Sequence, residues 1–95
     1  MVFVVTMTWS VDKGPEVAKR AAQQSKKAPP KGVKTVAEYV LLGQCKMIAI
    51  VDVPDEKTIL TIHAPMMDIA ECDWAPAMTP ENLLKSLGIS SVSFP

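Results

Sequence analysis

The distribution of apolar residues along the predicted strands is what most limits how this 95-residue chain can fold. Successive side chains of a strand point to opposite faces, so a sheet with one wet face alternates apolar and polar residues. Here three stretches are apolar on both faces. In residues 1–9 the two sets are Phe3, Val5, Met7 and Trp9 against Val2 and Val4 with Thr6 and Thr8. In residues 45–53 they are Met47, Ala49, Val51 and Val53 against Ile48 and Ile50, and in residues 33–42 they are Ala37, Tyr39 and Leu41 against Val36, Val40 and Leu42. We therefore expect both faces of the sheet to be buried.

Turn and capping residues divide the chain into a simple order of elements. Strands are predicted over residues 1–9, 33–42, 45–53 and 68–77, which are rich in β-branched and aromatic residues. Helices are predicted over residues 15–27 and 54–64, each with Pro in its first turn, and from Thr79 to a Gly88 cap. The order β-α-β-β-α-β plus a helix predicts one ferredoxin-like α+β domain over residues 1–95, with residues 79–95 as C-terminal helix and tail. Strands 1–9 and 45–53 should lie in the middle of an antiparallel sheet, with two helices on one face.

The first helix is predicted to place small residues against the sheet. Its apolar stripe is Val17, Ala18, Ala21, Ala22 and Ser25. Side chains this small let a helix lie close to a sheet and leave room for a cavity beside it.

Because two helices cover only one face of such a sheet, the other face needs a partner. The simplest partner is a second copy, packed sheet to sheet at ~10 Å. The alternative is that residues 79–95 fold back over the open face. We expect a homodimer formed through the open sheet face.

Charge is balanced overall but unevenly placed, with a net +5 in residues 1–47 and −5 in residues 48–95. This distribution predicts two solvated surfaces, which would be complementary across a dimer. The alternative is an anion site near Lys26, Lys27, Lys31 and Lys34.

Targeting and cysteine signals are weak. Cys45 and Cys72 are far apart and lack Cys-x-x-Cys spacing, which favours reduced thiols over a disulfide or a zinc site. No signal peptide opens the chain, and no stretch approaches the ~20 apolar residues of a membrane span. We expect a cytoplasmic protein without membrane contact.

Several short motifs together resemble one family. They are Trp9-Ser10 at the end of the opening strand, Pro-Lys-Gly-Val-Lys at 30–34, the Leu42-Gly43 turn, Asp68-Ile69, Trp74-Ala75-Pro76 and Thr79-Pro80-Glu81. In these the chain resembles domain of unknown function 3303, within the dimeric α+β barrel superfamily. The resemblance implies a ferredoxin-like protomer whose sheet forms a barrel with that of a second copy, and it implies no established activity. Related barrels include cofactor-free monooxygenases, isomerases and amino-acid-sensing modules.

His63 is the only histidine and so the natural acid–base candidate. It shares a helix face with Ile59, Ile62 and Met66, which should lie against the sheet. There it serves either as a hydrogen-bonded core histidine or as an acid–base group in a pocket. A single histidine without spaced partners predicts no metal site.

Other candidate residues for binding a ligand are Glu38, Tyr39, Trp9 and Trp74. Glu38 and Tyr39 point to opposite faces, and Glu38 is either solvated on an edge strand or buried with a partner. Trp9 and Trp74 should lie near each other and line an apolar pocket or pack in the core. Glu71 and Asp73 share one strand face, which favours an outward edge over a paired-carboxylate site.

Two function classes follow. The first is a non-catalytic homodimer that binds a small apolar ligand, senses it, or acts as an assembly module. The alternative is a cofactor-independent monooxygenase- or isomerase-like enzyme, with His63 as acid–base group and Tyr39 or a tryptophan orienting the substrate. No cofactor is expected, and nucleic-acid binding is disfavoured because residues 45–53 carry no aromatic side chain.

Overall fold

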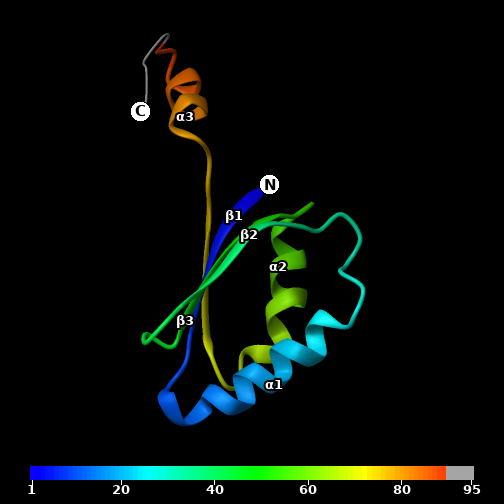
Figure 1. Cartoon of the computed structure of the whole chain (residues 1–95). Helices are drawn as coiled ribbons and strands as arrows, with labels where there is room; N and C mark the ends of the chain where they lie inside the picture. Colours follow the sequence, from blue (N-terminus) through cyan, green and yellow to red (C-terminus); the bar gives the residue numbers. More distant parts are fainter. Residues whose placement is uncertain (90–95) are drawn as a thin grey trace.

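The protein forms a four-stranded antiparallel sheet in the order β2-β3-β1-β4, with its two long helices on one side (Figure 1). The structure is a computed structural model and describes residues 1–89. The strands are β1 (Val2–Thr8), β2 (Lys34–Leu41), β3 (Lys46–Asp52) and β4 (Glu71–Pro76). The helices are α1 (Gly14–Ser25), α2 (Glu56–His63) and α3 (Pro80–Ser86). The predicted ferredoxin-like α+β fold, with β1 and β3 in the middle, is confirmed.

Three predicted boundaries are wrong, and one of them is the start of α2, at Glu56 rather than at residue 54. The first helix ends at Ser25 rather than at residue 27, and β4 begins at Glu71 rather than at residue 68. The late start of β4 follows from a short 3₁₀ helix, η2 (Ala64–Met66), that continues the chain after α2. The N–H groups of Ile69 and Ala70 both donate to the carbonyl of Met66, at 3.1 and 3.0 Å, and so cannot join the sheet. A second 3₁₀ helix, η1 (Val11–Lys13), precedes α1.

The core lies between the sheet and α2. Its main cluster is formed by Phe3, Val5, Ala49, Val51, Val53 and Ile59. A second cluster, formed by Met7, Val17 and Met66, lies beside it under the start of α1. Every buried strand residue belongs to one of the two alternate sets identified in the sequence, so that set faces the helices.

Helix α1 is held to the rest of the domain mainly near its beginning. Val17 is its only buried residue. Arg20 then donates to Glu16 Oε1 at 3.0 Å and to the carbonyl of Pro65 at 3.0 Å, and it also bonds the carboxylate of Asp68. The predicted stripe is wrong beyond Val17, because Ala18, Ala21, Ala22 and Ser25 are exposed. Such small side chains bury too little apolar area to hold the later turns against the sheet.

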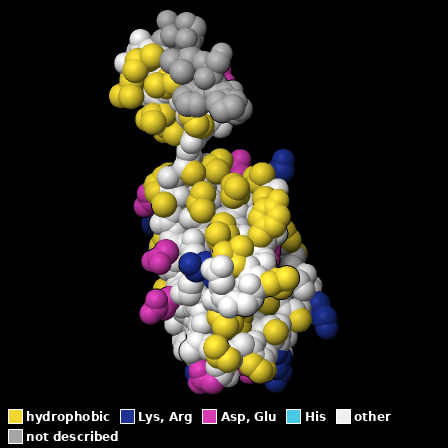
Figure 2. Space-filling view, turned by 60° about the vertical axis from the view of Figure 1, so that its left-hand side comes forward, with side chains coloured by type: hydrophobic (Ala, Val, Ile, Leu, Met, Phe, Trp, Pro, Cys, Tyr) yellow, Lys and Arg dark blue, Asp and Glu magenta, His cyan; other side chains and the backbone are white. Residues whose placement is uncertain are grey.

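The side of the sheet away from α1 and α2 carries a second apolar surface, here called the open face. Its central residues are Val4, Thr6, Ala37, Tyr39, Leu41, Ile48 and Ile50, as the strand register shows. Tyr39 is 66% exposed, and the others are only partly buried. Figure 2, turned so that this side comes forward, shows hydrophobic side chains on the domain and on the projecting C-terminal segment.

The alternative cover for the open face, residues 79–95, is wrong for the part that the structure describes. Helix α3 projects beyond the end of the sheet (Figure 1), and none of its residues is buried. Of the predicted C-terminal tail, Ile89 is exposed, and residues 90–95 lie outside the described residues.

Replacing Ile59 by Ala should lower the free energy of unfolding by about 2–5 kcal/mol, because Ile59 is 0% exposed and a cavity would remain. Leu60→Ala on the same helix is the matched control, since Leu60 is 48% exposed; its loss should stay near 0.5 kcal/mol. Urea denaturation followed by circular dichroism measures both values. Equal losses in the two variants would contradict the assignment of α2's core side.

Candidate functional site

A partly open cavity of about 270 Å³ lies between the sheet and the later turns of α1 and α2. Its sheet side is formed by Val5, Met7, Thr35, Glu38, Met47, Ala49 and Val51. Its helix side is formed by Ala21, Gln24, Ser25, Ile62, His63 and Met66. The lining is mostly apolar, with polar groups from five side chains. This cavity occupies the space that the small residues of α1 leave beside the sheet.

A bulge in β2 decides which of its side chains reach the cavity. The β2–β3 register shifts between Thr35 and Ala37, so Val36 is an extra residue in the strand. After the shift Glu38 lies opposite Ala49 and faces the helices, whereas Tyr39 lies opposite Ile48 and belongs to the open face. Glu38 therefore lines the cavity while remaining exposed, which places its carboxylate at the mouth.

His63 forms the buried polar part of the cavity wall. It is the last residue of α2 and is 8% exposed. Its ring lies beside that of Trp74, with centroids 5.6 Å apart and planes tilted by 48°. Nδ1 is fully buried and has no hydrogen-bond partner among the described residues. Burial lowers the pKa of His63 below its usual value of 6.5, so the ring is neutral at pH 7.

The structure unites some of the predicted site residues and separates others. His63 and Glu38 line the same cavity, whereas Trp74 does not line it and packs beside the ring of His63. Tyr39 does not line the cavity. Trp9 and Trp74 pack in different clusters, so the expectation that they lie together is wrong. The cause is position along the sheet, because Trp74 lies opposite Val5 whereas Trp9 follows the end of β1.

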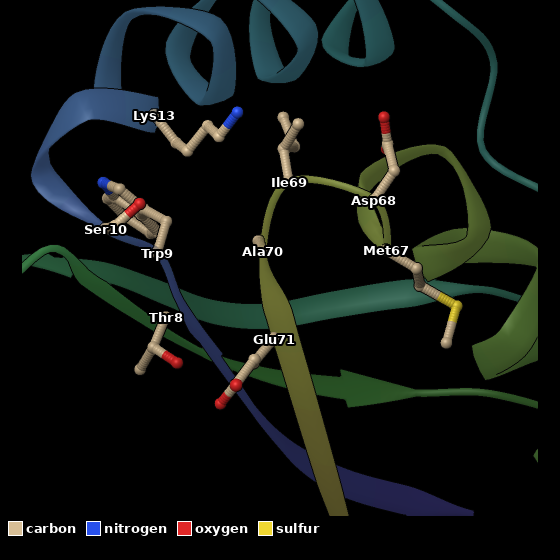
Figure 3. A pocket seen from close by; sticks show the side chains of 9 residues that line it. All are labelled: Thr8, Trp9, Ser10, Lys13, Met67, Asp68, Ile69, Ala70 and Glu71. Carbon is tan, nitrogen blue, oxygen red and sulfur yellow. The ribbon is translucent and has the colours of Figure 1, made fainter.

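Trp9 instead lines a second, shallower hollow of about 470 Å³ at the end of β1. Figure 3 shows that Lys13, Asp68 and Glu71 contribute its charged groups from separate segments and point in different directions. Asp68 is already bonded by Arg20, and this contact holds the pKa of its carboxyl below the usual value. The hollow thus offers no converging set of polar groups, and the cavity with His63 is the stronger candidate.

The remaining candidates do not converge on either site. Glu71 and Asp73 lie opposite Thr8 and Thr6 and are exposed, in agreement with an outward edge face. Lys26, Lys27, Lys31 and Lys34 are exposed, and none lines the cavity. Within residues 1–89 no group of three His, Cys, Asp or Glu side chains is placed to hold a metal ion. No helix in that range is long and apolar enough to cross a membrane.

Sequence reasoning missed two residues of the cavity wall, namely Gln24 and Thr35. Gln24 follows Ala21 by three positions and shares its helix face, so helical spacing could have indicated it. Thr35 carries no such signal, because its direction depends on a bulge that no Gly or Pro marks in the sequence.

The fold and the cavity define a ferredoxin-like α+β domain with a small, mostly apolar cavity between its sheet and helices. Comparison with family models places the chain more narrowly. Residues 1–88 match the model of "Domain of unknown function (DUF3303)", so the chain belongs to this family. No curated protein matches the chain.

The burial of His63 predicts a loss of stability in mild acid. The unfolded chain takes up a proton near pH 6.5, whereas the folded chain does so only at lower pH. Neutral His63 therefore makes its full contribution to the free energy of unfolding above pH 6.5. This free energy falls as the pH drops from 6.5 toward the lower pKa of His63 in the folded chain. Urea denaturation at pH 7.5, 6.5 and 5.5 measures the effect.

His63→Gln provides the control for this pH series. Because His63 is the only histidine, the variant should lose the pH dependence between 7.5 and 5.5. Asp55 and Asp68 do not contribute to this pH dependence, because their carboxyl pKa values are lowered from the usual 3.8 and they take up protons only in more acidic solution. An unchanged pH profile in His63→Gln would show that His63 is not the titrating group.

Proposed function

We propose that this protein is a non-catalytic homodimeric domain that binds a small, largely apolar molecule in the cavity lined by His63 and Glu38. The observation that carries the proposal is the cavity itself. Small-molecule sites are concave and mainly apolar, with a few polar groups that orient the ligand. At about 270 Å³ this cavity lies just below the lower end of that size class, which is about 300 Å³, and suits a small metabolite.

The polar groups of the wall limit what the ligand can be. The neutral ring of His63 has an unpartnered Nδ1, and a buried polar atom gains when a ligand supplies a hydrogen bond. Glu38 is the one charged side chain in the lining, and a carboxylate repels an anion. The ligand is therefore an apolar molecule with a hydrogen-bonding group and no negative charge. Because lysine side chains attract anions, a ligand without negative charge favours the cavity over the lysines of residues 26–34 as the binding site.

The second candidate function is a cofactor-independent monooxygenase- or isomerase-like enzyme acting on a small apolar substrate. The observation in its favour is that neutral His63 lines the cavity and could accept a proton there. Against it, no group among the described residues hydrogen-bonds Nδ1, whereas a catalytic base is ordinarily oriented by a third group. The binding function is the better supported of the two.

Filling the cavity should abolish ligand binding. Ala21→Leu adds volume to the wall, and Ala22→Leu is the matched control, because Ala22 is exposed and does not line the cavity. A panel of small neutral apolar compounds is screened by thermal unfolding. A compound present at 100 times its Kd should stabilise the wild type by about 2.7 kcal/mol, or on the order of 10 °C in Tm.

Ala22→Leu should keep this shift and Ala21→Leu should lose it. No shift across a broad panel, or equal shifts in both variants, would count against the cavity as the site. For any compound that binds, turnover measured with the wild type and His63→Ala separates the two functions. Turnover that disappears in His63→Ala would favour the enzyme, and binding without turnover favours the proposed role.

The homodimer is supported by the amount of surface that one protomer exposes. The accessible area is 6923 Å². A folded monomer of 10.3 kDa exposes about 5,400 Å², roughly 1,500 Å² less. A stable interface of standard size buries about 800 Å² on each partner. The projecting α3, which has no buried residue, contributes to this excess. The partly exposed apolar residues of the open face are the natural surface for an interface.

A charge in the middle of the open face should dissociate the dimer. Ile48→Asp would place a carboxylate in the interface without a partner, which raises the free energy of association. Val11→Asp is the control, because Val11 is 81% exposed and lies outside the sheet. Sedimentation velocity over a concentration series measures both. A wild-type protein that remains monomeric at high concentration would rule out the dimer.

A further inference from the structure

The cavity beside His63 carries charge of one sign only. Among the described residues that line it, Glu38 alone is charged, and its carboxylate lies at the mouth. No Lys or Arg side chain of residues 1–89 forms an ion pair with Glu38. Because His63 is neutral at pH 7, the wall carries no positive charge to balance this carboxylate.

Both helices that border the cavity also end at it. Ser25 is the last residue of α1 and His63 is the last residue of α2, and both belong to the lining. The carbonyl groups in the last turn of a helix carry a partial negative charge, which attracts cations. The ends of α1 and α2 therefore add to the negative potential that Glu38 produces in the cavity.

The positive side chains of the neighbouring segments do not line the cavity. Two lysines follow α1 at residues 26 and 27 and are exposed. The side chain of Lys34 lies on the open face, as the β2–β3 register shows. Arg20 reaches past the end of α2, but its charge is paired with the carboxylates of Glu16 and Asp68. The negative potential of the lining is thus not cancelled from within the wall.

We propose that the cavity binds a small primary amine, with its ammonium group at the mouth beside Glu38 and its hydrocarbon part inside. This inference rests on the proposed ligand-binding function and specifies the chemical class of the ligand. Such an amine is positively charged at pH 7, because an alkylammonium group such as that of lysine has an unperturbed pKa of about 10.4.

The position of Glu38 at the mouth suits an ammonium group better than a buried carboxylate would. Removing an ammonium ion completely from water is costly, even when it is paired. Glu38 is exposed, so the ammonium group keeps part of its hydration while it contacts the carboxylate. The hydrocarbon part then replaces water along the apolar wall, which is the favourable step.

The strand register indicates the length of the hydrocarbon part. Glu38 lies opposite Ala49, and Ala49 lies opposite Val5, so the three form one row across β2, β3 and β1 on the helix side. Neighbouring strands lie about 4.8 Å apart, so this row spans about 10 Å. An extended hexylamine molecule is of similar length, and the row beyond Glu38 is apolar.

Isothermal titration calorimetry with hexylamine, hexanol and hexanoate tests the charge preference, because the three compounds share a chain length and differ in charge. In dilute salt the wild type should bind hexylamine about fivefold more tightly than hexanol, the upper range for an exposed ion pair. Hexanoate should bind more weakly than hexanol. Added salt should reduce the preference for hexylamine and leave the binding of hexanol nearly unchanged.

Glu38→Gln removes the charge at the mouth and keeps the size of the side chain. In this variant the preference for hexylamine over hexanol should fall below about twofold. Glu56→Gln is the matched control, because Glu56 is exposed, does not line the cavity, and its replacement changes the net charge of the chain equally. It should keep the preference, and circular dichroism verifies that both variants are folded.

The outcomes separate this inference from ligand binding itself. If hexanol binds as tightly as hexylamine, or if Glu38→Gln keeps the preference, the cavity stands as a binding site and the amine is overturned. Hexanoate binding more tightly than hexylamine also overturns the amine, since the lysines at residues 26 and 27 would then dominate. If none of the three compounds binds, or if Ala21→Leu binds them as the wild type does, both inferences are overturned.

Discussion

The structure depends on one imbalance: a sheet that is apolar on two sides and a chain whose helices cover only one of them. The covered side holds every buried residue of the strands, from Phe3 and Val5 in β1 to Val51 in β3. The uncovered side keeps residues such as Ile48 and Ile50 partly in contact with water. Apolar area left in water represents hydrophobic free energy not yet gained. The hydrophobic free energy that stabilises a domain of this size is small, since small domains bury a smaller fraction of their surface.

The cavity arises from how α1 is attached. Val17 and Arg20 hold the beginning of the helix, while its later turns carry alanine, glutamine and serine and remain apart from the sheet. A tighter helix with larger residues would close this space and add to the core. The cavity therefore coincides with weak packing on one side of the domain, and it places a buried, unpartnered imidazole next to an apolar wall. Both features suit the binding of a molecule better than they suit stability.

The sequence was informative wherever local periodicity and capping residues act alone. The order of elements followed from the strand patterns and from the prolines at the helix starts, and the central strands followed from that order. The two alternate sets of side chains in residues 1–9 and 45–53 were recognised, but the sequence did not show which set faces the helices. The small residues of α1 indicated a cavity, and the position of His63 on a face with Ile59 indicated that it would be buried. The sequence could not show that α1 departs from the sheet after Val17, because this depends on the area that each contact buries. It also could not separate Trp9 from Trp74, because strand register is a relation between distant segments.

The bulge at Val36 couples two surfaces that otherwise have nothing in common. Because the bulge takes up one additional residue, Glu38 reaches the cavity and Tyr39 the open face. Removing that residue would leave both side chains on their present faces, because Ala37 would still pair with Ile50 and Glu38 with Ala49 in a regular ladder. An additional residue inserted between Ala37 and Glu38 would instead exchange them, placing Glu38 opposite Ile48 on the open face and Tyr39 opposite Met47 on the cavity side. The bulge thus lets β2 lose one residue without changing either surface, whereas gaining one there changes the cavity and the open face together.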